Sequence, residues 1–255
     1  MRKWALVTGA TSGIGESFAR LLASQGFNIA LVARDHARLV ERSEFLKNSY
    51  QVETAVIQAD LSLDSGCVIV EQYLAQNEIE VLVNNAGFGI KYAFTTSSIV
   101  AEEELLNVLV RAPMRCMHVL LPKMKERNSG TIINVSSVAS WIAGGTYSAS
   151  KSYLTVLSES IHMELSKTNI KVMALCPGFT HTEFHQRGKM KMSSLPEFMW
   201  LTSDAVAKKA WSDSQAGKAI SVPGWQYLLL STFARFSPRP IVRKLGINIR
   251  ARQRR

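Results

Sequence analysis

Residues 4–15, WALVTGATSGIG, lead from an apolar run directly into a turn that contains three glycines. The apolar part has the composition of a buried strand, and residues 13–25 follow it as a predicted helix. Because Gly9, Gly13 and Gly15 let a ligand approach the backbone, the helix N-terminus can offer its free N–H groups to a pyrophosphate. The spacing is GxxxGxG and not the GxGxxG dinucleotide pattern, so a tight turn without a ligand is the alternative.

The same order of apolar run and helical segment is repeated along the chain. Further apolar runs lie at 28–34, 52–60, 80–87, 131–140, 170–178 and 219–224. Nearly continuous Val, Ile and Leu strands that alternate with helices indicate a parallel sheet covered on both faces. We therefore predict an α/β fold with a single-domain, Rossmann-type, doubly wound parallel sheet of about seven strands, with ligands at the strands' carboxyl ends.

Composition limits the class of protein. The chain has 255 residues, 47% of them hydrophobic, and neither an internal repeat nor a Pro/Gly/Ser linker divides it, which favours one domain. Cys67, Cys116 and Cys176 are widely spaced and form no metal-ligand pattern, so we expect reduced core thiols in a cytoplasmic protein. The chain enters a strand at once, without room for a signal peptide, and no apolar run reaches the roughly 18–20 residues of a membrane-spanning helix.

The end of the second predicted strand favours one cofactor over another. A NAD site presents Asp or Glu to the adenosine ribose there, but this chain has Ala33 followed by Arg34. A guanidinium suits a 2′-phosphate, so NADP is favoured over NAD, although Asp35 comes one residue later. The alternative is that Arg34 is a surface charge at the start of a helix.

Polar residues also follow the third and fourth predicted strands. Asp60 can accept a hydrogen bond from an adenine amino group, or it can cap the helix that begins near Ser62. Residues 84–87, NNAG, combine two amide side chains with a small surface that a ligand can approach closely.

Five motifs occur in one order along the chain: TGATSGIG, NNAG, the serine of INVSS, YSASK and PGFTHT. Together they resemble the short-chain dehydrogenase/reductase family, over residues 4 to about 222. The resemblance implies NAD(P)-linked carbonyl/alcohol chemistry in a domain of residues 1–222, with a mobile substrate loop at 183–203, and a homodimer or homotetramer. Residues 223–255 are then a C-terminal amphipathic helix and basic tail. The predicted cofactor contacts are Thr8, Gly9, Ser12, Gly13, Ile14, Gly15, Arg34, Asp60, Leu61, Asn85, Ala86, Gly87, Tyr147, Lys151, Pro177, Gly178, Thr180 and Thr182.

The stretch TYSASK, residues 146–151, places Tyr147 and Lys151 four positions apart on a predicted helix, so both side chains project from one face. A surface pair is the alternative for an isolated YxxxK. In the family that the chain resembles, the tyrosine is the general acid for reduction and the lysine holds the nicotinamide ribose. Because a nearby ammonium favours the phenolate, we expect Lys151 to lower the pKa of Tyr147 from its usual value near ~10.

A serine should hold the carbonyl oxygen of the substrate. Ser137 fits the family position, with Ser136 as the second candidate. Ser137 precedes Tyr147 by ten residues, fewer than in many relatives, and the two glycines of VASWIAGGT can compensate for the shorter loop.

One position departs from the family pattern. Many members carry an asparagine that organises a water-linked proton relay to the lysine, and the matching position here is Leu109. Asn107 is two residues away, rotated by about 200° on an ideal helix, and is a poor substitute. Leucine can neither bind water nor stabilise an opened helical turn, which predicts a rebuilt relay, slower catalysis or a binding site without turnover.

The segment 183–203 is rich in apolar residues and therefore predicts a hydrophobic substrate. Its apolar members are Met190, Met192, Leu195, Phe198, Met199 and Trp200. Lys189 and Lys191 can meet an anionic carrier such as coenzyme A or a carrier protein, or remain solvated. His181 and His185 are four positions apart, but Glu183 is misplaced for an HExxH zinc site, so no metal is predicted.

The C-terminal segment carries most of the net charge of +10, because residues 235–255 hold eight Lys or Arg and no acid. Before it, one helical stripe is formed by Trp225, Leu228, Leu229, Thr232, Phe233 and Phe236. Packing on the domain or on a second subunit is one interpretation. Association with an anionic membrane surface and nucleic-acid contact are the others.

We therefore predict an NADP-dependent oxidoreductase that reduces the carbonyl, or oxidises the alcohol, of a hydrophobic substrate such as an acyl or other lipid-like compound. NAD is the less favoured cofactor. The alternative is a catalytically weakened NADP-binding sensor or scaffold that associates with membrane through its C-terminal tail. The expected location is cytoplasmic, with peripheral contact at the inner membrane surface.

Overall fold

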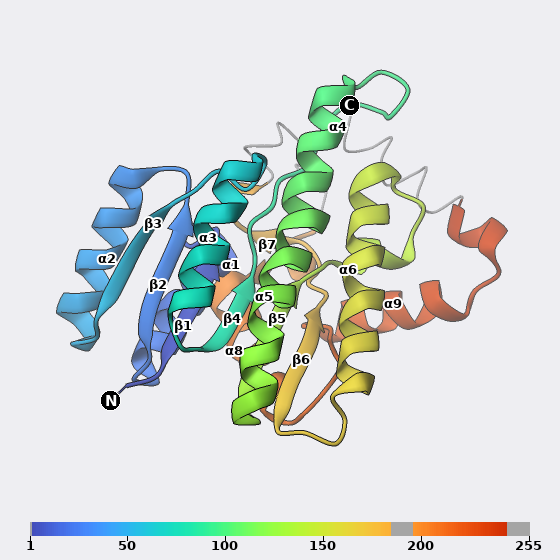
Figure 1. The fold of residues 1–255 in the computed structure, drawn as a ribbon. Helices are drawn as coiled ribbons and strands as arrows, with labels where there is room; N and C mark the ends of the chain where they lie inside the picture. The colour runs from blue at the N-terminus through green and yellow to red at the C-terminus, as the bar shows by residue number, and fades with distance from the viewer. Residues whose placement is uncertain (1, 185–195, 244–255) are drawn as a thin grey trace.

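The computed structural model describes residues 2–184 and 196–243 and confirms the predicted α/β fold (Figure 1). Seven strands form one parallel sheet in the order β3-β2-β1-β4-β5-β6-β9. These strands are β1 (Trp4–Thr8), β2 (Asn28–Ala33), β3 (Thr54–Gln58), β4 (Ile79–Asn84), β5 (Gly130–Val135), β6 (Ile170–Leu175) and β9 (Ile220–Ser221). Each overlaps one of the seven apolar runs of the sequence, with β4 and β5 beginning one residue before theirs, so the apolar pattern located every strand of the sheet.

Helices cover both faces of this sheet (Figure 1). They are α1 (Gly13–Ser24), α2 (His36–Tyr50), α3 (Asp64–Gln76), α4 (Ile99–Leu106), α5 (Ala112–Arg127), α6 (Gly145–Glu164), α8 (Ser203–Gln215) and α9 (Trp225–Phe236). Side chains alternate between two buried clusters along β1: Leu6 packs with α3, α5 and α6, whereas Ala5 and Val7 pack with α1, α2 and α8. This alternation follows from the two-residue period of a strand that is buried on both faces.

The chain order reverses between β1 and β4, which are neighbours in the sheet although two strands lie between them in sequence. Ligands of doubly wound sheets bind outside the carboxyl ends of the strands at such a point. The turns after β1 and β4 are therefore the expected centre of the site.

Two short elements beyond the sheet were not predicted. Thr180–His181 (β7) pairs in parallel with Leu201–Thr202 (β8) and closes the base of the predicted substrate loop. Within that loop Met190, Met192, Leu195, Lys189 and Lys191 lie outside the described residues, as does His185. No helix in 2–184 or 196–243 has both the length and the apolar character that crossing a bilayer requires.

Candidate active site

The turns after β1 and β4 are joined by a reciprocal set of hydrogen bonds. The Thr8 hydroxyl accepts the N–H groups of Asn85 and Ala86 at 2.9 and 3.0 Å. In return, the Asn85 amide donates to the carbonyls of Thr8 and Gly9 at 2.9 and 3.2 Å. Thr8 and Asn85 therefore hold the two turns together through contacts that both side chains make with backbone.

Glycine is required in the first turn by close approach and by backbone angle. Gly9 has φ +66°, and a Cβ there would lie 2.8 Å from the amide nitrogen of Asn85. Gly13 has φ +57°, and a Cβ there would lie 2.7 Å from the methyl carbon of Thr182. A Cβ at Gly15 would overlap the Gly9 carbonyl. The turn is thus packed against NNAG on one side and against the PGFTHT segment on the other.

The N-terminus of α1 has no side-chain cap, as is also true of α3, α5, α6 and α9. Asp35, Ser98 and Thr202 each accept a backbone N–H in the first turn of α2, α4 and α8. Ser12 occupies the N-cap of α1 with extended backbone and makes no such bond. Since the first N–H groups of a helix lack partners within the helix, α1 keeps its donors for a ligand.

The ends of β2 and β3 lie beside this turn in the sheet. Arg34 follows β2 directly and is exposed, as a contact to a bound 2′-phosphate requires. Asp60 accepts from the Ser62 backbone N–H at 3.0 Å and from its hydroxyl at 2.7 Å. The helix α3 begins only at Asp64, so Asp60 orders the loop before the helix and is not its cap. Leu61 is buried next to it.

A second arginine near Arg34 was missed by the sequence analysis. Arg38 in the first turn of α2 forms a two-pronged ion pair with Glu183, with N–O distances of 2.7 and 3.0 Å. The pair joins α2 to the start of the substrate loop across a sequence separation of 145 residues. No local pattern in the sequence indicates this pair, because its two members are far apart along the chain.

Tyr147 and Lys151 project together from α6, as the sequence predicted. The ammonium of Lys151 lies 5.8 Å from the centroid of the Tyr147 ring. Its side chain is almost fully buried, with 4% exposed, and donates to the Val135 carbonyl at 2.6 Å. The helix α6 begins at Gly145, shortly after the short 3₁₀ turn Val138–Trp141. Gly145 has φ +71°, a left-handed conformation that glycine adopts readily.

The two candidate serines have different environments. Ser137 hydrogen-bonds the Tyr147 phenol, and its hydroxyl also accepts the Ala139 N–H at 3.1 Å. Ser136 is buried and points into α6, where it donates to the Lys151 carbonyl at 2.8 Å and pairs with the Thr155 hydroxyl. Ser137 is the serine beside the phenol, and Ser136 positions the backbone of Lys151.

The pKa of the phenol differs from the expectation. Burial raises the pKa of Tyr147 to about 12, and the hydrogen bond from Ser137 opposes this only in part. Burial also lowers the pKa of Lys151 to about 8. The prediction that Lys151 lowers the Tyr147 pKa was wrong for this structure, because desolvation of the phenol raises that pKa. The phenol is consequently held in its protonated form.

Leu109 lies in a single π-helical turn, Asn107–Arg111, in which the Ala112 N–H bonds the Asn107 carbonyl five residues earlier. The opened turn is therefore kept without an asparagine at its centre, contrary to the expectation for leucine. Asn107 faces elsewhere and donates to the Ser62 carbonyl at 2.9 Å, as its rotation on the helix predicted. A Cβ on Gly87 would meet Leu109 at 2.9 Å and the Lys151 ammonium at 3.9 Å.

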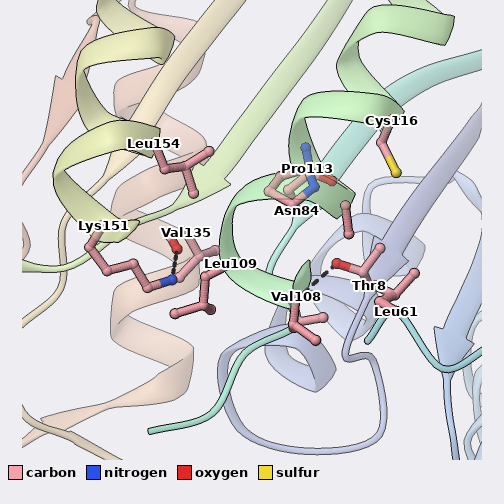
Figure 2. Close-up of a pocket in the computed structure, with 12 residues that line it drawn as sticks. Thr8, Leu61, Asn84, Val108, Leu109, Pro113, Cys116, Val135, Lys151 and Leu154 are labelled. Carbon is pink, nitrogen blue, oxygen red and sulfur yellow. Dashed lines mark hydrogen bonds between the residues drawn. The ribbon is translucent and has the colours of Figure 1, made fainter. Parts of the chain in front are cut away.

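Leu109 and Lys151 border a small cavity behind the site (Figure 2). Figure 2 shows Lys151 from α6 and Leu109 from the π-helical turn reaching toward one region, with the Lys151 bond to Val135 between them. The cavity is otherwise lined by Thr8, Leu61, Asn84, Ala86, Val108, Ala112, Pro113, Cys116, Val135 and Leu154. The cavity is mainly apolar. Where the family pattern has an asparagine that binds water, this chain has Leu109, which cannot bind water.

Buried side-chain amides form a chain of hydrogen bonds that ends on α6. The Asn84 amide donates to Asn134 at 2.8 Å, and the Asn134 amide donates to the Ser158 hydroxyl at 2.8 Å. The chain links β4, β5 and α6, which carry the NNAG turn, the serines and the Tyr147–Lys151 pair. The signal in the sequence was an asparagine within the apolar run TIINV, because a buried amide must be hydrogen-bonded.

The PGFTHT segment crosses the front of the glycine turn. The Pro177 carbonyl accepts the Val138 N–H at 3.1 Å, and Gly178 packs so tightly on the Tyr227 ring that a Cβ would overlap it. Thr180 donates to the Gly178 carbonyl at 3.0 Å, and Thr182 lies over Gly13. This segment therefore borders the space between the α1 N-terminus and the Tyr147 face of α6.

The remaining predicted features have structural roles. His181 stacks on Trp200 with ring centroids 4.7 Å apart and contacts Glu197 at 3.2 Å. Within 2–184 and 196–243, no group of three or more His, Cys, Asp or Glu side chains is arranged to hold a metal ion. The three cysteines are buried free thiols, as predicted. Ile14, in the first turn of α1, is partly buried against the core.

This geometry agrees with what the chain resembles. Residues 3–192 match the family model described as short chain dehydrogenase. An inactive hydroxysteroid dehydrogenase-like protein 1 from Pongo abelii is 31% identical over 243 residues, which are 92% of this chain and 72% of that protein. A very-long-chain 3-oxoacyl-CoA reductase from Rattus norvegicus is 35% identical over 188 residues, 71% of this chain and 60% of that protein. The chain belongs to the short-chain dehydrogenase family of oxidoreductases.

A solved structure shows the same architecture. A short-chain dehydrogenase from Sphingobium yanoikuyae in complex with NADPH superimposes with a TM-score of 0.84 at 28% identity. The match covers 91% of this chain and 93% of that one.

The residues present fit the nicotinamide dinucleotide that the family implies. The uncapped N-terminus of α1, beside a turn in which Gly9, Gly13 and Gly15 leave no room for a Cβ, offers free N–H groups and the positive end of the helix dipole to a pyrophosphate. The exposed guanidinium of Arg34 stands at the strand end where an adenosine ribose would lie. Lys151 and Tyr147 lie on α6, on the other side of the glycine turn from Arg34 in the strand order.

Burial of the Lys151 ammonium makes stability depend on pH in a defined direction. With a pKa of about 8 when folded against 10.5 when unfolded, the unfolded chain binds more protons between these values, so stability rises with pH there. Relative to Lys151→Met, the wild-type free energy of unfolding should increase by about 3 kcal/mol between pH 7 and pH 10.5. Urea unfolding of both proteins across this range measures the difference.

The control is Lys167→Met, which removes an exposed lysine. Its difference from wild type should be flat over the same range. A flat difference for Lys151→Met as well would show that the ammonium is solvated.

Proposed function

We propose that this oxidoreductase uses NADP(H) to reduce the carbonyl group of a hydrophobic, acyl- or lipid-like substrate. The observation that carries the proposal is the Tyr147 phenol, which is protonated by burial, hydrogen-bonded to Ser137 and 5.8 Å from a buried ammonium. A reduction needs a proton for the oxygen atom that becomes the alcohol, and a protonated phenol supplies it. In keeping with the family it resembles, the protein should act as a homodimer or homotetramer.

Each of the three residues has one task in this proposal. The Ser137 hydroxyl donates a hydrogen bond to the carbonyl oxygen and polarises it. Tyr147 transfers its proton to that oxygen as negative charge develops there. Lys151 stabilises the tyrosinate that remains, because an ammonium nearby favours the ionised phenol. A bound nicotinamide supplies the hydride.

Several features support NADP as the cofactor. Arg34 is exposed at the end of β2. Guanidinium groups bind phosphate through paired, charge-assisted hydrogen bonds. The similar dehydrogenase of Sphingobium yanoikuyae is in complex with NADPH. Contacts to the pyrophosphate would come from the glycine turn, and Asp60, Leu61, Ala86, Gly87 and residues 177–182 complete the proposed cofactor site.

The substrate class is supported by the surface around the loop base. Phe184 packs on the Tyr147 ring with centroids 5.8 Å apart, and Phe179 packs on Trp200 at 5.9 Å. Phe198 is exposed nearby. Aromatic groups of this kind favour an apolar chain or ring system over a small polar carbonyl compound. A relative named very-long-chain 3-oxoacyl-CoA reductase is consistent with an acyl substrate.

Tyr147→Phe tests the assignment of the proton donor. The variant keeps the ring but lacks the proton, so turnover of a carbonyl substrate should fall by about 10²- to 10⁴-fold. NADPH binding, followed by fluorescence titration, should change little. Purified protein with a panel of hydrophobic ketones, aldehydes and acyl thioesters provides the assay.

Tyr153→Phe is the matched control, since Tyr153 lies on the same helix but outside the site and is partly exposed. It should keep wild-type turnover. Undiminished activity of Tyr147→Phe would reject the assignment.

Arg34→Asp tests the cofactor preference. The change removes a phosphate contact and adds a carboxylate that can accept from a ribose 2′-hydroxyl, so the ratio of kcat/KM for NADPH over NADH should fall at least about tenfold. Lys47→Asp makes the same charge change near the far end of α2 and should leave the ratio unaltered. An unchanged ratio in Arg34→Asp would identify Arg34 as a surface charge only.

A second candidate function is a catalytically weakened NADP-binding sensor or scaffold. Leu109 favours it, because an apolar side chain stands where the family pattern places a water-binding amide beside Lys151. A relative with the name inactive hydroxysteroid dehydrogenase-like protein 1 points the same way.

Leu109→Asn separates the two candidates. The π-helical turn already exists, so an asparagine can enter it and face the cavity beside Lys151. If the site is weakened by Leu109, NADPH oxidation should rise at least about tenfold, within the range of a restored proton path. Leu109→Ala controls for the change in volume. A robust wild-type rate would reject the second candidate.

A further inference from the structure

The helix α9 is packed with its apolar side toward solvent. It is held to the domain by Gln226, Tyr227 and Ser231, and Tyr227 is only 1% exposed. On the other side, the stripe that the sequence predicted is open, with Trp225 71% and Phe236 83% exposed. The other exposed apolar residues of the helix are Leu228, Leu229, Leu230 and Phe233. A surface helix usually turns such a stripe inward, so this face is available to a partner.

The orientation of α9 is fixed by its buried side. The Tyr227 hydroxyl accepts the Phe179 N–H at 3.0 Å and donates to the Met199 carbonyl. The Gln226 amide donates to the Phe198 carbonyl at 3.1 Å. These contacts tie the first turn of α9 to both ends of the substrate loop. The helix cannot roll its apolar side inward without breaking them.

The charge next to this face selects the partner. Residues 214–255 contain nine Lys or Arg and no Asp or Glu. Arg239 and Arg243 follow α9 directly and are exposed, and Arg235 lies on α9 itself, over the Trp141 ring at 5.4 Å. A second copy docked through α9 around a two-fold axis would bring another basic, acid-free segment to the interface and no carboxylate from residues 214–255 to pair with the arginines, because a two-fold interface uses one patch twice. An anionic lipid surface offers apolar and negative groups together.

We infer that α9, with Arg235, Arg239 and Arg243, binds the surface of an anionic membrane. The helix would lie in the plane of the interface. The exposed stripe would enter the acyl boundary and the arginines would contact lipid phosphates. Because the first turn of α9 contacts Phe179 and Met199 through Tyr227, membrane binding would hold the base of the substrate loop near the lipid surface. Substrate capture from the membrane rests on the proposed function, whereas the binding itself does not.

Vesicle co-sedimentation of the full-length protein tests the inference. The wild type should sediment with vesicles of phosphatidylcholine and phosphatidylglycerol, and bind phosphatidylcholine alone far more weakly. High salt should weaken the binding to anionic vesicles. Leu229→Glu should lower the partition coefficient at least about tenfold, and Arg239→Gln should lower it about fivefold.

Met163→Glu is the matched control, because Met163 on α6 is 69% exposed and Leu229 62%, so both changes put a carboxylate on an open apolar position. It should partition as the wild type does. Tyr147→Phe should also bind normally, and retained binding without any NADPH-dependent turnover would defeat only the proposed function. Equal binding by Leu229→Glu and wild type, or no binding to anionic vesicles, would overturn the inference. So would a wild-type dimer in sedimentation velocity that Leu229→Glu alone dissociates, since a second copy would then cover the stripe.

Discussion

The burial of the Lys151 ammonium is the constraint on which the rest of the site depends. An ammonium with 4% of its side chain exposed requires a hydrogen-bond acceptor, and the Val135 carbonyl at the end of β5 provides it. That bond fixes α6 against β5. Ser136 adds to it, because its hydroxyl donates to the Lys151 carbonyl and pairs with the Thr155 hydroxyl on α6. Tyr147, one turn earlier on α6, is thereby held over the carboxyl ends of the strands, where a ligand of this fold would bind.

Burial shifts the pKa values of Tyr147 and Lys151 in opposite directions. It raises the pKa of the phenol to about 12 and lowers that of the ammonium to about 8. The phenol is thus protonated at neutral pH, as a proton donor for reduction must be. The ammonium is still mainly charged there, and can stabilise the ionised phenol only once the proton has left.

The regular parts of the molecule were readable from residue patterns. Seven apolar runs became seven strands, and the glycine turn, NNAG and the Tyr147–Lys151 pair all lie at one edge of the sheet. These features depend on local periodicity or on spacing along one helix. The class of fold and the centre of the site follow from such local rules.

The errors and omissions involve contacts between distant segments. The pKa of Tyr147 depends on how deeply the phenol is enclosed, which spacing along a helix does not reveal. The pair of Arg38 with Glu183 and the bonds of Tyr227 to the loop base join residues 145 and 48 positions apart. The π-helical turn at Leu109 persists because tertiary packing can maintain it without the side chain that the family pattern places there. Apolar periodicity identified the stripe of α9, but it could not show that the stripe faces solvent and not the core.

The protonation state of Tyr147 tests the central claim most directly. Tyrosine labelled with ¹³C at Cζ gives one NMR signal per residue, and the Tyr147→Phe spectrum identifies the one that belongs to Tyr147. At pH 10.5 this signal should retain the chemical shift of a neutral phenol, whereas a short tyrosine peptide in the same buffer, with a pKa near ~10, should be mostly ionised. A Tyr147 phenol that is half ionised at or below pH 10 would contradict the account.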